Sequence, residues 1–467
     1  MKTLTFALVS LAACTESPPT VVATGNANDS RFTAVLSYLQ QQMMDYDIPG
    51  ASIAIVDHGQ LYAAAGVGTK REGETDQVEP STLFRVASLS KLVTASTAMS
   101  LVESGELAFD HPVTDYAPLG LAPGFDPSSI TVADLLDHTS GIPDLSASTD
   151  CSADRATWFA QNASEPLWTS PGEIWNYSNR GYGVAGWAIE GAAKQTYEDV
   201  AAARVFGPAG MTTATFDVNA ATEGDHAVGH VHDDGGTTFY EPDAYTCAAT
   251  RPAGGVIASA LDYASLAQTL LANGGAMLQP GSVAELETGY ADPHDTADDR
   301  DRYGYGLYVR DGWKGLHVVR HSGEEPGYES SIWMVPDQQF AVVVMFNATG
   351  RKPSHVAERA IDEFLDVTDV AAPDNATAPS TWAAFAGDYY DPYVLGDVSV
   401  RFDGNALYAS ASAINANDLV LTQVSGNEFS ATLEGKTGDL TFYPDANGTT
   451  AWLVTREGVA RHEVALP

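Results

Sequence analysis

The feature of this sequence that most constrains its fold is a region, 30–370, with strand-like segments at both ends and helical segments between them. Near its start, two apolar runs flank the turn Asp57-His58-Gly59 and predict strands at 51–56 and 61–66. Near its end, further runs predict strands at 303–310, 317–322, 330–335 and 340–346. Apolar residues at helical spacing predict helices at 31–44, at 356–365 and, interrupted by Gly and Pro loops, over most of 88–278.

This order of elements predicts an α/β (α+β) fold. One antiparallel sheet is built from both ends of the region, helices flank it, and the central part forms an inserted helical lobe. In such a fold, a ligand site is expected in the cleft between the sheet and the lobe.

The last part of the chain has a different character. Residues 371–381 are small and polar and include proline, as expected of a linker. Over 382–467, short strand-like runs alternate with turn signals such as Asp403-Gly404-Asn405 and Ser425-Gly426-Asn427. Their even spacing predicts a second domain, a small all-β barrel or sandwich.

The N-terminus has the features of an export signal. A lysine and a short apolar run lead to Leu11-Ala12-Ala13-Cys14, so 1–13 is expected to be a signal peptide. These four residues resemble the bacterial lipoprotein box, in which the cysteine carries the lipid, and an ordinary signal peptide cleaved nearby is the alternative. Residues 14–29 are expected to form a tether. The protein is thus expected in the cell envelope of a bacterium, lipid-anchored and facing the periplasm.

The net charge of the chain excludes some partners. The 467 residues include 23 Lys and Arg against 61 Asp and Glu, a formal charge of −38 with no basic block. Such a surface repels nucleic acid and anionic lipid, so no nucleic-acid partner is expected, and membrane contact only through a lipid on Cys14. Acidic residues are spread along the chain, which is typical of a solvated surface.

The first chemical motif is Ser88-Leu89-Ser90-Lys91. A serine at the start of a helix and a lysine three residues later lie on one face, about one turn apart. A buried lysine can then assist removal of the hydroxyl proton, and the helix N-terminus favours the developing negative charge. A helix cap at Ser88 with a solvated Lys91 is the structural alternative. The residues that follow are apolar almost all round, which favours a buried helix.

The second motif is Tyr177-Ser178-Asn179, expected on an extended loop. Residues two apart on such a loop point the same way, so a phenol and an amide face one site. The phenol can serve as base and acid, and the amide can hold a substrate carbonyl or the lysine. Alone, this spacing is commonplace and usually structural.

The third motif is His321-Ser322-Gly323, at the end of a predicted edge strand and followed by Glu324. A donor, a hydroxyl and a glycine on such a strand allow a substrate backbone to lie alongside. The glycine permits close approach, and the next backbone N–H can face an oxyanion.

Together, and in this order, the three motifs resemble the serine β-lactamase and penicillin-binding-protein superfamily. The resemblance is closest to the branch of class C β-lactamases, D-Ala-D-Ala carboxypeptidases and family VIII esterases, where Tyr-x-Asn replaces Ser-Asp-Asn. It covers about residues 30 to 365 and includes Ile48-Pro49-Gly50 and the segment 135–143, Leu-Leu-Asp-His-Thr-Ser-Gly-Ile-Pro. The region from Trp382 resembles the lipocalin-like β domain that follows several of these hydrolases.

The resemblance implies a β-lactamase/transpeptidase-like fold, no cofactor, and a role for each motif residue. Ser88 would be the nucleophile, Lys91 its activator, and Tyr177 the general base and leaving-group acid. Asn179 would position the substrate, and His321, Ser322 and Gly323 would form the third wall of the site. The backbone N–H groups of Ser88 and Glu324 would form the oxyanion hole.

Histidine at position 321 departs from the β-lactamase pattern, which has lysine there. Lysine is a permanent cation that suits a β-lactam carboxylate, whereas histidine near neutral pH is largely uncharged. The same substitution occurs in peptidase and esterase branches of the family, and it argues against efficient β-lactam hydrolysis.

Two other patterns are interpreted as structural. Lys436-Thr437-Gly438 matches Lys-Thr-Gly literally, but it lies in the C-terminal β region, where a hairpin turn is expected. His226, His230 and His232 fit no compact zinc spacing, and nearby glycines favour a solvated loop, so no metal is expected.

Besides Cys14, the chain has two cysteines, Cys151 and Cys247. Both are expected in the helical lobe. In an oxidising compartment they can form a disulfide, and two separate buried thiols are the alternative.

Two hypotheses from different classes follow. One is a serine hydrolase that acts through an acyl-enzyme on Ser88. Its small-molecule or peptide substrate would be a D-amino-acid peptide, amide or ester. The other is a catalytically silent envelope protein that uses the fold for binding or scaffolding. The joint presence of Ser88, Lys91 and Tyr177 favours the enzyme. Within it, a carboxypeptidase-like peptidase or an esterase ranks above a β-lactamase.

Overall fold

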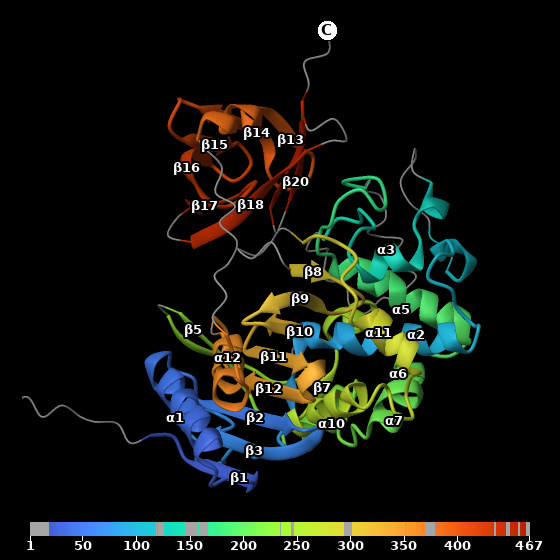
Figure 1. Cartoon of the computed structure of the whole chain (residues 1–467), viewed down its shortest axis with the longest axis vertical. Coiled ribbons are helices and arrows are strands. Elements are labelled where there is room, and N and C mark those ends of the chain that lie inside the picture. The colour runs from blue at the N-terminus through green and yellow to red at the C-terminus, as the bar shows by residue number, and fades with distance from the viewer. Residues whose placement is uncertain are drawn as a thin grey trace, which may run out of the picture.

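The computed structural model describes residues 18–117, 119, 126–144, 157, 167–233, 235–243, 247–293, 301–350, 352–368, 379–433, 436–444, 449–455 and 458–463. The expected signal peptide, Cys14, Cys151 and most of the expected linker lie outside these residues. The described part forms a larger body of sheet and helices, up to residue 368, and a small C-terminal β domain (Figure 1). No helix in it is long and apolar enough to cross a membrane.

The body is built on one eight-stranded antiparallel sheet in the order β1-β3-β2-β12-β11-β10-β9-β8. Its strands are β1 (Val21–Gly25), β2 (Gly50–Asp57), β3 (Gln60–Gly68), β8 (Asp301–Tyr303), β9 (Tyr308–Trp313), β10 (Leu316–Glu325), β11 (Tyr328–Val335) and β12 (Phe340–Phe346). The two ends of the region meet where β12 pairs with β2, with Val343 opposite Ala54. The predicted sheet built from both ends is therefore confirmed.

Each face of the sheet is covered by helices, which is why its central strands are apolar on both sides. On one face lie α1 (Ser30–Asp45) and α12 (Pro353–Phe364), with Phe32, Leu39 and Ile361 in the shared core. On the other lie α2 (Ser90–Glu103) and α10 (Ala260–Leu271), where a second core continues into the helical lobe (Figure 1).

The helical lobe occupies the middle of the chain and packs against α2. Its helices are α3 (Val132–Leu136), α5 (Asn179–Ala193), α6 (Tyr197–Ala201), α7 (Gly207–Ala209), α8 (Val218–Glu223), α9 (Arg251–Gly254) and α11 (Pro280–Leu286). Two small sheets accompany it, β4 (Phe84–Arg85) with β7 (Ile257–Ala258), and β5 (Gly229–Asp233) with β6 (Gly236–Tyr240).

The C-terminal domain is a closed antiparallel barrel of eight strands. They are β13 (Gly387–Asp391), β14 (Gly396–Phe402), β15 (Leu407–Ala411), β16 (Ala416–Ser425), β17 (Glu428–Leu433), β18 (Lys436–Pro444), β19 (Thr450–Thr455) and β20 (Val459–His462). Phe385, Tyr389, Phe429 and Phe442 pack in its interior, so the barrel is filled by side chains. Of the two architectures predicted for this domain, the barrel is the correct one.

Four local predictions outside the expected active site are wrong. Residues 21–25, within the expected tether, form β1, which pairs with β3. The expected strand 303–310 is broken between Tyr303 and Tyr308, where Gly306 has a φ of 77°. The histidine segment is not a loop, because His230 and His232 lie on β5 of a hairpin. Lys436-Thr437-Gly438 begins strand β18 rather than forming a turn.

The three histidines that were considered as metal ligands each contact a different residue. His226 contacts Glu241, His230 contacts the Asn347 carbonyl oxygen, and His232 contacts Thr237. Cys247 is disulfide-bonded. Because Cys151 lies outside the described residues, its pairing with Cys247 stays a prediction.

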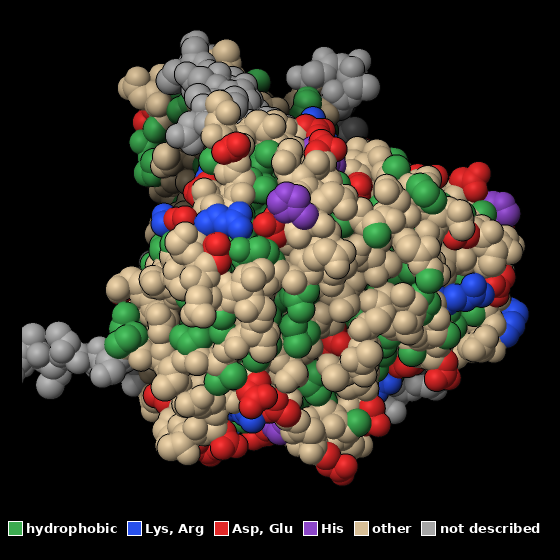
Figure 2. Space-filling view, turned by 60° about the horizontal axis from the view of Figure 1, so that its bottom comes forward, with side chains coloured by type: hydrophobic (Ala, Val, Ile, Leu, Met, Phe, Trp, Pro, Cys, Tyr) green, Lys and Arg blue, Asp and Glu red, His purple; other side chains and the backbone are tan. Residues whose placement is uncertain are grey.

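The charged side chains of the surface are mostly acidic on the face shown in Figure 2. On the face in Figure 2, Asp and Glu side chains are scattered over the surface, with few Lys or Arg side chains between them. This dispersed pattern agrees with the solvated acidic surface expected from the composition.

Candidate active site

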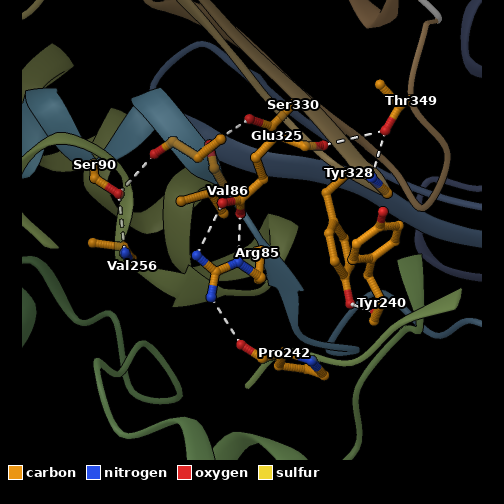
Figure 3. Close-up of polar contacts among 12 residues, drawn as sticks. Arg85, Val86, Ser90, Tyr240, Pro242, Val256, Glu325, Tyr328, Ser330 and Thr349 are labelled. Carbon is orange, nitrogen blue, oxygen red and sulfur yellow. Dashed lines mark hydrogen bonds and ion pairs between the residues drawn. The ribbon is translucent and has the colours of Figure 1, made fainter. Parts of the chain in front are cut away.

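The site begins with the turn that carries Ser88. Ser88 lies in a single 3-10 turn, Ala87–Leu89, that runs directly into α2, whose residues 90–101 are all buried. Ala87 has a φ of 47°, a left-handed conformation that costs energy for a residue with a side chain. Ser90 supports this turn by donating to the Ala87 carbonyl at 2.7 Å and accepting from the Val256 N–H at 3.0 Å (Figure 3). The strained turn is thus fixed by the neighbouring elements.

Lys91 lies one turn later and is completely buried. Its Nζ donates to Ser88 Oγ at 3.0 Å, to Asn179 Oδ1 at 2.7 Å and to the Ala253 carbonyl at 3.0 Å. The same Nζ lies 4.6 Å from the ring centre of Tyr177. The structure therefore brings together Ser88, Lys91, Tyr177 and Asn179, which are up to 91 positions apart in the numbering (179 − 88).

Asn179 is not on a loop but is the first residue of α5, with Ser178 as its N-cap. Its backbone N–H and its side-chain amide N–H both donate to the carboxylate of Asp144, each at 2.9 Å. This pairing fixes which end of the amide carries nitrogen, and so it turns the amide oxygen toward Lys91. Asp144 is a positioning residue that the sequence analysis missed, although it follows directly on the segment 135–143.

His138 holds the residues on both sides of Tyr177 by hydrogen bonds. It is fully buried, its Nδ1 accepts the Ser178 N–H at 3.0 Å, and its carbonyl accepts the Asn176 N–H at 2.8 Å. Its ring centre lies 4.3 Å from that of Tyr177. Because Nδ1 accepts a hydrogen bond, the imidazole proton is on Nε2 when the ring is neutral. His138 was noted only as part of a family motif, and the structure shows how it contacts the site.

His321 is also buried, with 2% of its surface exposed. Its Nε2 pairs with the Tyr303 hydroxyl at 3.0 Å, and its Nδ1 lies 2.6 Å from the Ser322 carbonyl oxygen. Burial, and to a smaller extent the nearby charge of Lys91, lower the pKa of His321 to about 3. At neutral pH this side chain is therefore an uncharged member of the cavity wall.

The lowered pKa of His321 predicts a pH dependence of stability. The unfolded chain protonates this histidine near its ordinary pKa of 6.5, whereas the folded protein resists protonation until about pH 3. Stability is therefore lost as the pH falls below 6.5, by about 2 kcal/mol at pH 5 for this one group. We expect urea unfolding at pH 8 and pH 5 to show a loss about 2 kcal/mol larger for the wild type than for His321→Gln. Equal losses in the two proteins would contradict the buried neutral histidine.

Strand β10 places the third motif against the Ser88 turn. A Cβ atom on Gly323 would lie 2.2 Å from the Val86 carbonyl oxygen and 2.9 Å from the Ser88 backbone nitrogen, so no side chain fits there. In the described part of the chain, β9 pairs with β10 only as far as Arg320. The next residues, including Ser322 and Glu324, pair with β11 alone and are exposed at the cavity. Strand β10 is therefore internal to the sheet, and the edge predicted for the third motif is confined to its last residues.

A partly buried ion pair joins the two sides of this contact (Figure 3). Arg85 donates two hydrogen bonds to the Glu325 carboxylate, at 2.6 and 2.9 Å, and a third to the Pro242 carbonyl at 2.8 Å. Ser330 donates to the Val86 carbonyl at 2.7 Å. Arg85 precedes Ser88 and Glu325 follows Glu324, so the pair joins the two segments that carry the expected oxyanion-hole N–H groups. This 240-residue separation gave no signal in the sequence.

One cavity of about 730 Å³ lies between the sheet and the helical lobe. Ser88, Tyr177, Asn179, His321 and Glu324 all contribute to its wall. The predicted cleft between sheet and lobe is therefore present.

The cations at this cavity are partly neutralised. Arg251 pairs with Glu198 at 2.7 Å and Arg320 with Asp301 at 2.8 Å. Asp301 also pairs with Arg310, and Lys352 lines the cavity as well, so some positive charge remains although His321 is neutral.

The fold and the contact between Ser88 and Lys91 together define a serine hydrolase. Its family is Beta-lactamase: the family model of that description matches residues 35–366, and the chain belongs to this family. The protein is therefore a serine hydrolase of the β-lactamase and penicillin-binding-protein superfamily.

Known relatives agree with this assignment. Penicillin-binding protein 4 of Amycolatopsis lactamdurans is 27% identical over 365 residues, covering 74% of this chain and 94% of that protein. The octameric penicillin-binding protein homologue from Pyrococcus abyssi superposes with a TM-score of 0.67 at 24% identity, covering 92% and 99% of the two chains. A D-stereospecific amidohydrolase from Streptomyces sp. superposes with a TM-score of 0.58 at 21% identity, covering 71% and 98%. At these identities the two structures show a shared fold.

Proposed function

We propose that the protein hydrolyses a D-amino-acid peptide, amide or ester through an acyl-enzyme on Ser88, as a D-alanyl-D-alanine carboxypeptidase-like enzyme or an esterase. The observation that carries this proposal is the 3.0 Å hydrogen bond from the buried Lys91 to Ser88 Oγ. Lys91 is buried, whereas Ser88 lines the cavity, so the lysine is held beside a serine that a substrate can reach.

In the proposed reaction, Lys91 assists removal of the Ser88 proton while Oγ attacks the carbonyl carbon of the substrate. Tyr177 acts as the general base and returns the proton to the leaving amine or alcohol. The oxygen of the tetrahedral intermediate accepts hydrogen bonds from the backbone N–H groups of Ser88 and Glu324. The close approach of Gly323 to the Ser88 nitrogen supports this pairing. Water then hydrolyses the acyl-enzyme.

The neutral state of His321 supports a peptidase or esterase over a β-lactamase. A β-lactam presents a carboxylate, which a permanent cation at this position would bind more strongly than an uncharged imidazole. The shared fold with a D-stereospecific amidohydrolase is consistent with an amide substrate. The β-lactamase is therefore the second candidate, and a silent binding protein would have no need of the hydrogen bond between Lys91 and Ser88.

A substrate panel tests the proposal. Purified protein is offered p-nitrophenyl esters, D- and L-amino-acid p-nitroanilides and a chromogenic cephalosporin, and kcat/KM is measured for each. We expect esters or D-amino-acid amides to be cleaved at least about tenfold faster than the cephalosporin, a difference of about 1.4 kcal/mol in transition-state binding. Preferential cephalosporin hydrolysis would support the β-lactamase, and no turnover of any compound would support the silent protein.

We also propose a location in the cell envelope, reached by export and held by a lipid on Cys14. Its support is the N-terminal sequence, together with the membership of this chain in a family that includes penicillin-binding proteins. An enzyme held there would meet peptides that contain D-amino acids.

A further inference from the structure

The C-terminal barrel packs directly against the segment that leads to Tyr177. Trp452 and Val454 on β19 and Val459 on β20 form a buried apolar cluster with Trp168 and Ile174 of the hydrolase body. Each of these five side chains is exposed by 8% or less. The ring of Trp168 also lies 6.2 Å from that of Tyr393, in the barrel.

Strand β19 has two different faces. Side chains alternate along a strand, so Trp452 and Val454 point one way and Leu453 the other. Leu453 belongs to the filled interior of the barrel, whereas its two neighbours belong to the cluster with the hydrolase body. One strand therefore offers interface residues and a matched internal residue side by side.

The segment under the barrel is held on its other side by backbone hydrogen bonds. Trp168 donates to Gly141 at 2.9 Å, Gly172 to Thr139 at 2.8 Å, and Asn176 to His138 at 2.8 Å. The hydrogen bond from Ser178 to the His138 ring at 3.0 Å completes this series. The segment 168–178 thus lies between the loop 138–141 and the barrel.

Neighbouring side chains of this segment have different surroundings. Ile174 packs on the barrel, while Trp175 and Tyr177 pack with Tyr303 at the active site. Without the barrel, Trp168 and Ile174 would face water, and the segment would lose one of the two surfaces that fix it. A shift of about 1 Å in a proton-transferring group can lower turnover about 100-fold, so this support has consequences for catalysis.

We propose that Trp452 and Val454 are positioning residues for Tyr177, and that the barrel serves to fix the Tyr177 segment from outside the cavity. The inference rests on the proposed function for the role of Tyr177 in proton transfer. It gives the C-terminal domain a specific task, which is to act on the active site through Trp168 and Ile174.

The test compares full-length variants. Trp452→Ala/Val454→Ala removes the contact, Leu453→Ala weakens the barrel without touching the hydrolase body, and Trp452→Phe keeps an aromatic ring at the interface. Active sites are titrated with a fluorophosphonate, and hydrolysis of a p-nitrophenyl ester is measured per titrated site. We expect the double variant to lose about 10- to 100-fold in kcat with KM changed less than about threefold. Leu453→Ala should lower the unfolding midpoint but keep the wild-type kcat. Trp452→Phe should keep most of the kcat that the double variant loses.

A double-mutant cycle with Tyr177→Phe links the effect to the tyrosine. If the barrel acts through Tyr177, removing the contact in the Tyr177→Phe protein lowers kcat less than about twofold further. Additive losses, or equal losses in Leu453→Ala and the double variant, would overturn the proposal. If the double variant does not fold, Val454→Ala alone makes the same comparison with Leu453→Ala.

A second measurement does not depend on activity. Hydrogen exchange of the Asn176 and Ser178 amides, both bonded to His138, should accelerate about tenfold or more in the double variant and stay unchanged in Leu453→Ala. Unchanged exchange in the double variant would overturn the proposal. A wild type that no fluorophosphonate labels would instead refute the proposed function, and the exchange experiment would still decide whether the barrel fixes this segment.

Discussion

Replacing Ser88 by alanine is expected to lower ester or amide turnover by about 10,000-fold or more, because the substitution removes the atom that forms the acyl-enzyme. The hydroxyl of Ser88 accepts a hydrogen bond from Lys91 at 3.0 Å, and Ala87 and Leu89 on either side are buried. The turn itself does not depend on the hydroxyl, so the unfolding midpoint should change by only a few degrees. The measurement is the initial rate with the best substrate of the panel.

The matched control is Ser37→Ala, on the exposed side of α1, which should keep the wild-type rate. A Ser88→Ala protein with more than about a tenth of wild-type turnover would contradict the assignment of the nucleophile.

Replacing Lys91 by methionine is expected to lower turnover about 1,000-fold or more. Methionine fills a similar volume but donates no hydrogen bond, so Ser88 loses its activator, and the Asn179 and Ala253 oxygens lose their donor. The comparison is Lys436→Ala, at the start of β18 in the barrel, where the literal Lys-Thr-Gly pattern lies. That variant should keep turnover within about twofold. Equal losses in the two variants would mean that the barrel motif takes part in the reaction.

The main sheet could be predicted from the sequence because its strands are local apolar patterns with clear turn signals. The runs at 51–56 and 340–346 are continuous and apolar, and they pair at the centre of the sheet. The barrel could be predicted for a related reason, since its turns recur at even spacing. The order of the three chemical motifs located the site, and the structure brings Ser88, Lys91 and Asn179 into contact.

The contacts that support the site could not be predicted, because they join residues that are distant in sequence. Arg85 and Glu325 are paired across 240 positions, and nothing near either residue indicates the other. Asp144 orients Asn179 from 35 positions away. A sequence shows which side chains can pair, but tertiary packing decides which of them do.

The wrong local predictions have physical causes. The break after Tyr303 occurs where Gly306 approaches α2 so closely that a Cβ atom would lie 2.7 Å from the Lys91 carbonyl oxygen. This constraint comes from the neighbouring helix and not from the pattern of the strand. Strand β1 is short and lies at the edge of the sheet, and its side chains are half-buried or exposed. A segment that needs no buried face has no sequence pattern that separates it from a flexible tether.

The uncharged state expected of His321 agrees with the structure, but the sequence did not show what keeps this side chain neutral. A histidine in place of lysine was expected to be largely uncharged near neutral pH. The structure adds burial and the nearby charge of Lys91, which together lower the pKa of His321 and keep the ring neutral well below that range. Neither could be inferred from the residue alone, since Lys91 is on helix α2, distant from His321 in the sequence.

The central claim is that Ser88 forms an acyl-enzyme, and the most direct test is the intact mass of the protein after incubation with a fluorophosphonate and with fluorescent penicillin, followed by peptide mapping. The account predicts one adduct per chain, on the peptide that contains Ser88, and no adduct in Ser88→Ala. An adduct that persists in Ser88→Ala, or one that maps to another serine in the wild type, would contradict it.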